Sequence, residues 1–199
     1  MHGKRPIRRV ACIGEVMIEL IARQDGSAQL GVAGDTFNTA VYMARILGDV
    51  EVAYVTALGR DPYSDRIMAA ARRYGLATDH IERRDGMMPG LYAIDTDAQG
   101  ERSFSYWRSA AAARTLFTAP CEVGLDKLSG FDLVFLSGIT LAILPPPVRA
   151  AILDWADGFR AAGGTLAYDS NHRAKLWQSA AVAREVNMAM WARADIALP

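Results

Sequence analysis

The sequence has little cysteine and no excess of charge of one sign. Its two cysteines, Cys12 and Cys121, are isolated, and each is expected to be a small core residue, as is typical of a reducing cytoplasm. The 22 basic residues balance the 22 acidic ones, so no basic surface for nucleic acid is predicted. Histidine is also scarce, and His2, His80 and His172 show no metal-ligand spacing.

Long apolar runs are missing as well. No run approaches the length of a membrane span, so no membrane partner is predicted. The first ten residues are basic like the head of a signal peptide, but the apolar run behind them holds Glu15 and Glu19 and is too polar for a signal-peptide core. Because 51% of the 199 residues are hydrophobic, the chain can bury one core, with or without a small appendage.

Strand-like and helix-like patterns alternate along the chain. An apolar strand at 10–14 continues into a partly alternating, half-exposed strand at 15–20, and a second apolar run fills 50–58. Asp61 and Pro62 open a helix that reaches about Tyr74. Further strands are predicted at 131–137, 165–169 and 195–198, and further helices at 41–47, about 148–162 and 182–194. This order predicts an α/β fold with a mostly parallel sheet flanked by helices.

A hairpin interrupts this rhythm, with strands at 90–95 and 102–108 around a loop that contains glycine. Period-two spacing places Phe104, Tyr106 and Arg108 on one face. Because an isolated hairpin is only marginally stable, we expect it to pair with the half-exposed strand at about 15–21. The three strands are predicted to form a small β-sheet lid, whose edges favour a homo-oligomer.

A glycine-rich turn at 31–40 leads directly into the first helix. Asp35 or Thr36 is expected to cap that helix. The unpaired N–H groups of a helix N-terminus suit a polar or anionic ligand. The alternative is an ordinary loop and cap without a ligand.

Ligands of open α/β sheets bind beyond the carboxyl ends of the strands. The turns expected at that edge are Gly14, Gly34-Asp35, Gly59-Arg60-Asp61, Ser137-Gly138 and 169–173. Arg108 and Arg173 are suited to hold a carboxylate, and Tyr106 offers a ring face and a hydroxyl. Together these residues predict a site for an acidic, hydroxylated small molecule. The alternative is that they form an exposed strand face and a surface charge.

Five stretches carry a resemblance by their order along the chain: residues 13–20, 33–45, 57–61, 105–112 and 169–173, the last followed by Leu176 and Trp177. In this order they resemble the pfkB (ribokinase-like) carbohydrate kinases and, among them, the kinases of 2-dehydro-3-deoxygluconate (KDG). The resemblance extends over nearly the whole chain. Its tyrosine- and arginine-containing hairpin points to an acid sugar and away from ribose, fructose or adenosine.

The resemblance implies transfer of the γ-phosphoryl group of ATP, with Mg²⁺, to a terminal hydroxyl of the sugar acid. Matched by motif, the implied substrate-binding residues are Gly34, Asp35, Asn38, Tyr92, Tyr106, Arg108 and Arg173. Asn171 is implied to lie near the phosphate and the metal, and no residue of this sequence is implied as a metal ligand. Charge stabilisation and alignment of the hydroxyl account for most of phosphoryl-transfer catalysis.

One departure from the family pattern concerns the catalytic base. The family has a late Gly-Ala-Gly-Asp motif, but the similar string here, at 32–35, matches the sugar-side motif, so Asp35 is rejected as the base. The base and the nucleotide-binding strands are therefore expected beyond Pro199. We expect the chain to be the N-terminal portion of a ribokinase-like domain, spanning 1–199, and inactive alone.

Three alternatives remain at this point. The chain is a non-catalytic module that binds a sugar acid or a partner, or it belongs to a kinase of another sugar such as 2-dehydrogluconate or fructose. The third alternative, a nucleotide-dependent oxidoreductase, is disfavoured because no Gly-x-Gly-x-x-Gly follows the first strand.

Overall fold

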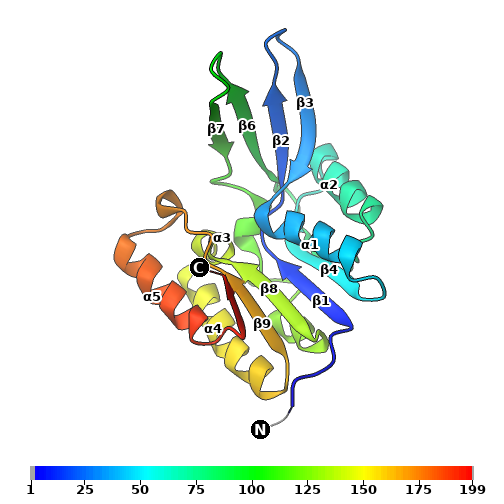
Figure 1. Ribbon diagram of the computed structural model, residues 1–199, viewed down its shortest axis with the longest axis vertical. Helices are drawn as coiled ribbons and strands as arrows, with labels where there is room; N and C mark the ends of the chain where they lie inside the picture. The colour runs from blue at the N-terminus through cyan, green and yellow to red at the C-terminus, as the bar shows by residue number, and fades with distance from the viewer. Residues whose placement is uncertain (1–2, 199) are drawn as a thin grey trace.

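The computed structural model describes residues 3–198 and contains two β-sheets (Figure 1). Met1, His2 and Pro199 lie outside the described residues, so the expectations that concern them have no structural counterpart here. The predicted α/β fold, with a mostly parallel central sheet flanked by helices, is confirmed.

The main sheet is six-stranded, and its order is β10-β9-β8-β1-β4-β5. All of its pairings are parallel. Its strands are β1 (Arg9–Ile13), β4 (Glu51–Leu58), β5 (Ile81–Arg83), β8 (Leu133–Ser137), β9 (Thr165–Asp169) and β10 (Ile196–Leu198). Within β4 every residue after Glu51 is buried, which is why its sequence is a continuous apolar run.

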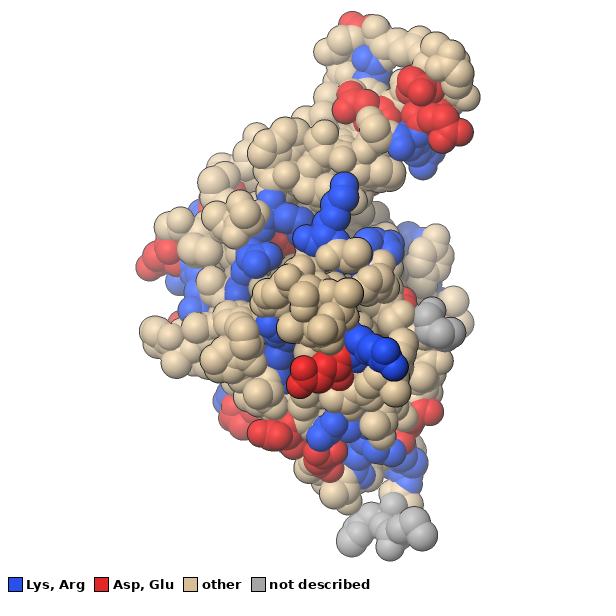
Figure 2. All heavy atoms as spheres, turned by 90° about the vertical axis from the view of Figure 1, so that its left-hand side faces the viewer, with Lys and Arg blue, Asp and Glu red and all other residues tan. Residues whose placement is uncertain are grey.

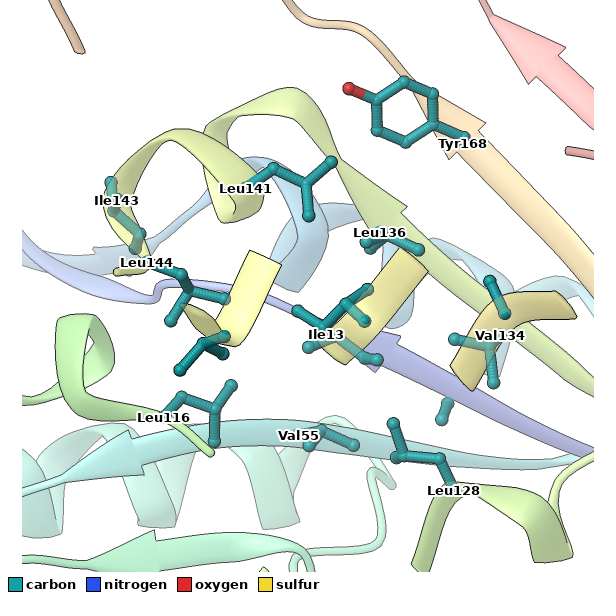
Figure 3. Packing of buried hydrophobic residues seen from close by; sticks show 14 of the residues in the cluster. Ile13, Val55, Leu116, Leu128, Val134, Leu136, Leu141, Ile143, Leu144 and Tyr168 are labelled. Carbon is teal, nitrogen blue, oxygen red and sulfur yellow. The ribbon is translucent and has the colours of Figure 1, made fainter. Parts of the chain in front are cut away.

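Helices cover both faces of this sheet (Figure 1). The first face carries α1 (Asp35–Ile46) and α2 (Pro62–Arg73), and the second carries α4 (Pro146–Ala161) and α5 (Ala180–Trp191). Alternate residues of each strand point to opposite layers, so Cys12 belongs to the first core cluster and Ile13 to the second. Figure 3 shows Ile13 in the second cluster with Val55 and Leu136 from the neighbouring strands.

The two first-face helices begin in different ways. Asp61 caps α2 as predicted, because its carboxylate accepts from the backbone N–H of Tyr63 at 2.9 Å and of Ser64 at 3.1 Å. The predicted cap of α1 is wrong, because the N-cap residue is Gly34 and makes no side-chain bond. Asp35 and Thr36 lie inside the helix, and their side chains bond to other elements instead.

The second sheet is four-stranded, in the order β3-β2-β6-β7, and stands away from the main sheet (Figure 1). Its strands are β2 (Met17–Ala22), β3 (Ala28–Ala33), β6 (Gly90–Thr96) and β7 (Arg102–Trp107). β2 pairs with β3 and β6 pairs with β7, both antiparallel, and a parallel pairing of β2 with β6 joins the two hairpins. The sequence did not predict β3. The strand predicted to begin at residue 15 begins at Met17, so Glu15 lies outside β2. The strand predicted to end at residue 108 ends at Trp107, so Arg108 lies outside β7.

The remaining elements are short, and several pack in the core. They are α3 (Gly138–Ile143) and three 3₁₀ helices, η1 (Ala112–Thr115), η2 (Leu125–Gly130) and η3 (Ala174–Leu176). The expected polar turn at Ser137-Gly138 is the start of α3. Cys12 is buried as predicted, but Cys121 is exposed, so the prediction of a second core cysteine is wrong. From residue 3 to residue 198, no helix is long and apolar enough to cross a bilayer.

Candidate functional site

A cavity of about 600 Å³ lies between the second sheet and the carboxyl ends of β8 and β9. Every residue predicted to bind the substrate or the phosphate contacts it: Gly34, Asp35, Asn38, Tyr92, Tyr106, Arg108, Asn171 and Arg173. The sequence did not predict several further residues of its wall as binding residues, among them Glu15, Met17, Ile139 and Lys175; Phe104, predicted to share a face with Tyr106, also lines it. The fold therefore brings together residues from both ends of the chain.

The carboxylate of Asp35 lies at the base of this cavity and is held from two directions. The Ser137 hydroxyl donates to Oδ2 at 2.5 Å, and the Asn171 side-chain amide donates to the same atom at 3.0 Å. Both hydrogen bonds end on Oδ2, and no hydrogen bond within residues 3–198 ends on Oδ1. Oδ1 therefore stays available to a ligand. A carboxylate fixed in this way is suited to accept a hydrogen bond from a sugar hydroxyl.

Gly34 permits the close approach that places Asp35. A Cβ atom at Gly34 would lie 2.4 Å from the backbone oxygen of Glu15, which no side chain tolerates. The glycine is therefore required by the contact between the start of α1 and the turn after β1. The same contact brings the first turn of α1 to the cavity, where Asn38 also lines the wall.

Three aromatic side chains of the second sheet form one wall. The sheet register places Tyr92 opposite Tyr106 and Ile94 opposite Phe104, so all three rings are on the same face. The ring centroid of Tyr92 lies 5.8 Å from that of Tyr106 and 6.4 Å from that of Phe104. About half of the Tyr106 and Phe104 side chains is exposed, which leaves ring surface for a ligand.

The hydroxyl of Tyr92 donates a hydrogen bond to the carboxylate of Glu19. Burial raises the pKa of this hydroxyl above its usual value, and the Glu19 carboxylate raises it further. The phenol therefore stays protonated, and its remaining role toward a ligand is that of a hydrogen-bond acceptor.

Arg108, predicted to hold a carboxylate of the ligand, is already paired with a carboxylate of the chain. Its guanidinium forms an ion pair with Glu15, which is 1% exposed, and only 11% of the Arg108 side chain is exposed. Burial raises the pKa of the Glu15 carboxyl, and the charge and hydrogen bond of Arg108 oppose that shift. The pair nevertheless borders the cavity, so Arg108 remains beside a ligand that enters it.

The chain after β9 supplies the opposite wall. Asn171 has a φ of 33°, a conformation that asparagine tolerates, and its backbone N–H donates to the Asp169 carboxylate at 2.9 Å. Arg173 and Lys175 also line the cavity, and neither makes a salt bridge in the part of the chain that the structure describes. Figure 2 shows Lys and Arg side chains gathered where the second sheet meets the body.

Three of the turns expected at this edge do not line the cavity themselves: Gly14, Ser137-Gly138 and Gly59-Arg60-Asp61. Ser137 still acts on the site through its bond to Asp35, whereas the Gly59-Arg60-Asp61 turn makes no such contact. Arg60 pairs with Asp85 at 2.5 Å, and Asp61 caps α2, so the charges of this turn serve local structure. Over residues 3–198, no group of three or more His, Cys, Asp or Glu side chains is arranged to hold a metal ion.

A comparison with protein-family models decides the family. Residues 7–199 match the model described as pfkB family carbohydrate kinase. The chain belongs to the pfkB family. Its relatives include proteins named 2-dehydro-3-deoxygluconokinase from Dickeya dadantii, 45% identical over 193 residues, and from Escherichia coli K12, 39% identical over 193 residues. Each alignment includes 96% of this chain and 62% of the relative. The chain therefore spans less than two thirds of the length of these relatives.

Solved structures of pfkB kinases share the fold. A PfkB protein from Polaromonas has a TM-score of 0.84 at 24% identity, with 98% of this chain and 65% of that chain covered. The 2-dehydro-3-deoxygluconokinase of Thermotoga maritima has a TM-score of 0.80 at 25% identity, with 95% and 58% covered. A Xylella fastidiosa fructokinase with bound ATP also has a TM-score of 0.80, at 24% identity, with 96% and 57% covered. The pfkB fold thus extends over nearly all of this chain.

Proposed function

We propose that this chain carries the sugar-acid-binding part of a kinase that transfers the γ-phosphoryl group of ATP to KDG. The observation that carries the proposal is the single cavity in which the Asp35 carboxylate, an aromatic wall and cationic side chains meet. Relatives named 2-dehydro-3-deoxygluconokinase, at 36–45% identity, support the choice of this sugar acid.

Each wall of the cavity suits a different part of such a ligand. Asp35 accepts hydrogen bonds from sugar hydroxyls, and the rings of Tyr92 and Tyr106 pack against the carbon skeleton. The guanidinium group of Arg108 attracts the carboxylate of the sugar acid. The guanidinium group of Arg173 attracts the polar end of the sugar acid or the transferring phosphoryl group. We propose that the second sheet acts as a lid, because it supplies the aromatic wall from outside the main body.

ATP and Mg²⁺ belong to the proposal as well. The Xylella fastidiosa fructokinase with bound ATP shares this fold, which supports ATP as the donor. Asn171 and Arg173 offer the amide and guanidinium N–H groups that suit phosphate oxygens. When bound, ATP supplies the phosphoryl group, and Mg²⁺ neutralises charge on its oxygens.

We further propose that the 199 residues bind the sugar acid without transferring phosphate. Asp35 belongs to the string that resembles the sugar-side motif, and its carboxylate is already engaged by Ser137 and Asn171. We assign its free Oδ1 to a sugar hydroxyl as a hydrogen-bond acceptor, and the other carboxylate of the cavity wall, Glu15, is paired with Arg108 and is not free to take the proton of the attacking hydroxyl.

Titration calorimetry of the purified chain with KDG tests the proposal, with 2-dehydrogluconate and D-fructose as competing sugars. Saturable KDG binding that is tighter than binding of both other sugars supports it. Absence of KDG binding by folded protein, or equal binding of D-fructose, would overturn it. A second arm adds ATP, Mg²⁺ and KDG and measures phosphorylated product, and turnover at ordinary kinase rates would contradict the non-catalytic part.

A further inference from the structure

Glu15 lies where all four passages of the chain between the body and the second sheet meet. Glu15 belongs to the first passage, which connects β1 to β2. The second passage connects β3 to α1 through Gly34, and a Cβ atom at Gly34 would clash with the backbone oxygen of Glu15. The third passage connects β5 to β6 and ends at Gly90, where a Cβ atom would lie 2.8 Å from Glu15 Oε1. Arg108, in the fourth passage, pairs with Glu15 directly. Glu15 thus lies against every connection to the second sheet, with its backbone oxygen at Gly34 and its carboxylate at Gly90 and Arg108.

The pair uses only part of the hydrogen-bonding capacity of its two members. A terminal nitrogen of Arg108 donates to Glu15 Oε2. Glu15 Oε1 and Arg108 Nε are buried and have no hydrogen-bond partner among the residues that the structure describes. The guanidinium carbon also lies 6.0 Å from the centroid of the Tyr106 ring. Arg108 is therefore fixed at one edge and bordered by an aromatic ring at the cavity.

We propose that Glu15 is a positioning residue that holds the Arg108 guanidinium against the cavity wall, so that its other terminal nitrogen faces the carboxylate of the ligand. This inference deepens the proposed function and rests on it. An arginine side chain has many rotamers, and fixing it in advance lowers the entropy lost on binding. Without the Glu15 carboxylate, Arg108 turns toward solvent and the site loses its preference for an acid.

A second buried glutamate–arginine pair provides a matched control. Glu82 is 4% exposed and pairs with Arg84 at 3.1 Å, and that pair also has one unpartnered oxygen and an unpartnered Nε within residues 3–198. Its chemistry is similar, but neither residue lines the cavity. A purely structural role of Glu15 would therefore make Glu15→Gln behave like Glu82→Gln.

The first experiment measures the ratio of the dissociation constants for D-fructose and KDG by calorimetry. We expect Glu15→Gln and Arg108→Ala each to lower this preference about tenfold or more, as loss of one hydrogen bond to a charged group does. The double variant is expected to lose no more than Arg108→Ala alone, because both changes remove the same interaction. Glu82→Gln is expected to lower the melting temperature without changing the preference. An unchanged preference in Glu15→Gln, alongside a loss in Arg108→Ala, would overturn the positioning role.

The second experiment needs no ligand. Phenylglyoxal modifies accessible arginines, and mass spectrometry gives the rate at each site, with exposed Arg173 as the internal reference. We expect Arg108 to react slowly in the wild type and several-fold faster in Glu15→Gln and in Glu15→Asp, whose shorter side chain keeps the charge. Equal rates in folded variants would overturn the inference. Failure of the wild type to bind KDG would overturn the proposed function instead, and the modification rates would still decide the positioning of Arg108.

Discussion

The side-chain amide of Asn171 donates a 3.0 Å hydrogen bond to the carboxylate of Asp35, although 136 positions separate the two residues. Ser137, at the end of β8, donates to the same oxygen. The contact joins the first residue of α1 to the chain that follows β9. The base of the cavity is therefore set by the parallel sheet, whose strands all end at this edge.

Substitution of Asp35 tests whether its carboxylate binds the sugar. We expect Asp35→Asn to weaken KDG binding by about 1.5–3 kcal/mol, the usual contribution of a hydrogen bond to a charged group, while the fold stays intact. Calorimetry measures the affinity. Asp49→Asn, at an exposed position outside the cavity, serves as the control and is expected to leave it unchanged. Equal affinities of wild type and Asp35→Asn would remove Asp35 from the site.

The aromatic wall predicts a loss of affinity without a comparable loss of stability. Tyr106 is 53% exposed, so Tyr106→Ala is expected to change the melting temperature little. Loss of the ring should weaken KDG binding by about 0.5–1.5 kcal/mol, the contribution of burying roughly 20–60 Å² of apolar surface between the ring and the sugar carbons. Trp107→Ala alters the neighbouring residue of β7, which is exposed but does not line the cavity, and is expected to bind normally. Equal effects of the two substitutions on affinity would contradict the assignment.

Two glycines should respond to alanine in opposite directions. Gly34→Ala places a methyl group 2.4 Å from a backbone oxygen, and we expect it to lower the free energy of unfolding by about 1–3 kcal/mol. Gly158 lies inside α4 with no atom within 4 Å of its Cβ position, so Gly158→Ala should raise that free energy by about 0.4–1 kcal/mol. Urea unfolding measures both. A neutral Gly34→Ala would show that the close contact relaxes without cost.

The cap of α2 predicts a pH-dependent contribution to stability. Partial burial raises the pKa of Asp61, but hydrogen bonds from Ser64 and Tyr63 outweigh it and hold the pKa below its usual value of 3.8. The folded state therefore favours the carboxylate. We expect Asp61→Ala to cost about 1 kcal/mol at neutral pH.

Because the folded-state pKa is lowered, this contribution is present above pH 3.8 and is lost as the pH falls through the folded-state pKa. Urea unfolding of wild type and Asp61→Ala over a pH series measures the difference. Asp65→Ala serves as the control, because it removes a carboxylate from the first turn of the same helix that does not cap the helix. A difference that stayed constant down to the most acidic folded sample would contradict the carboxylate cap.

The sequence predicts the elements that have strong patterns and misses those that depend on their partners. The apolar run of β4 and the Asp-Pro start of α2 identify those elements from local sequence alone. β3 has the sequence AQLGVA, in which only Val32 is β-branched, and it becomes a strand because six of its residues pair with β2. Tertiary pairing there overrides weak local propensity.

The same distinction holds for the site. Asn171 and Arg173 meet Asp35 because parallel strands end at one edge, which is a property of the fold class that the sequence indicates. Tyr92, Tyr106 and Arg108 come instead from the second sheet. The Glu15–Arg108 pair joins residues 93 positions apart, and no local pattern shows which carboxylate a given arginine will contact. Asp35 lies inside its helix, after the N-cap Gly34, and its side chain binds Ser137 and Asn171, both distant in the chain.

The parallel pairing of β2 with β6 has a consequence for how the molecule assembles. Met17 lies opposite Gly90, so this pairing closes a loop between residues 73 positions apart (90 − 17), and the loop contains α1, β4 and α2. Neither hairpin is stable in isolation, and loop closure is unfavourable until intervening structure has brought the ends together. The main sheet and its first helices should therefore form early in folding, and the two hairpins should join late. Amide hydrogens in β2 and β6 should then exchange with solvent before those in β1 and β4.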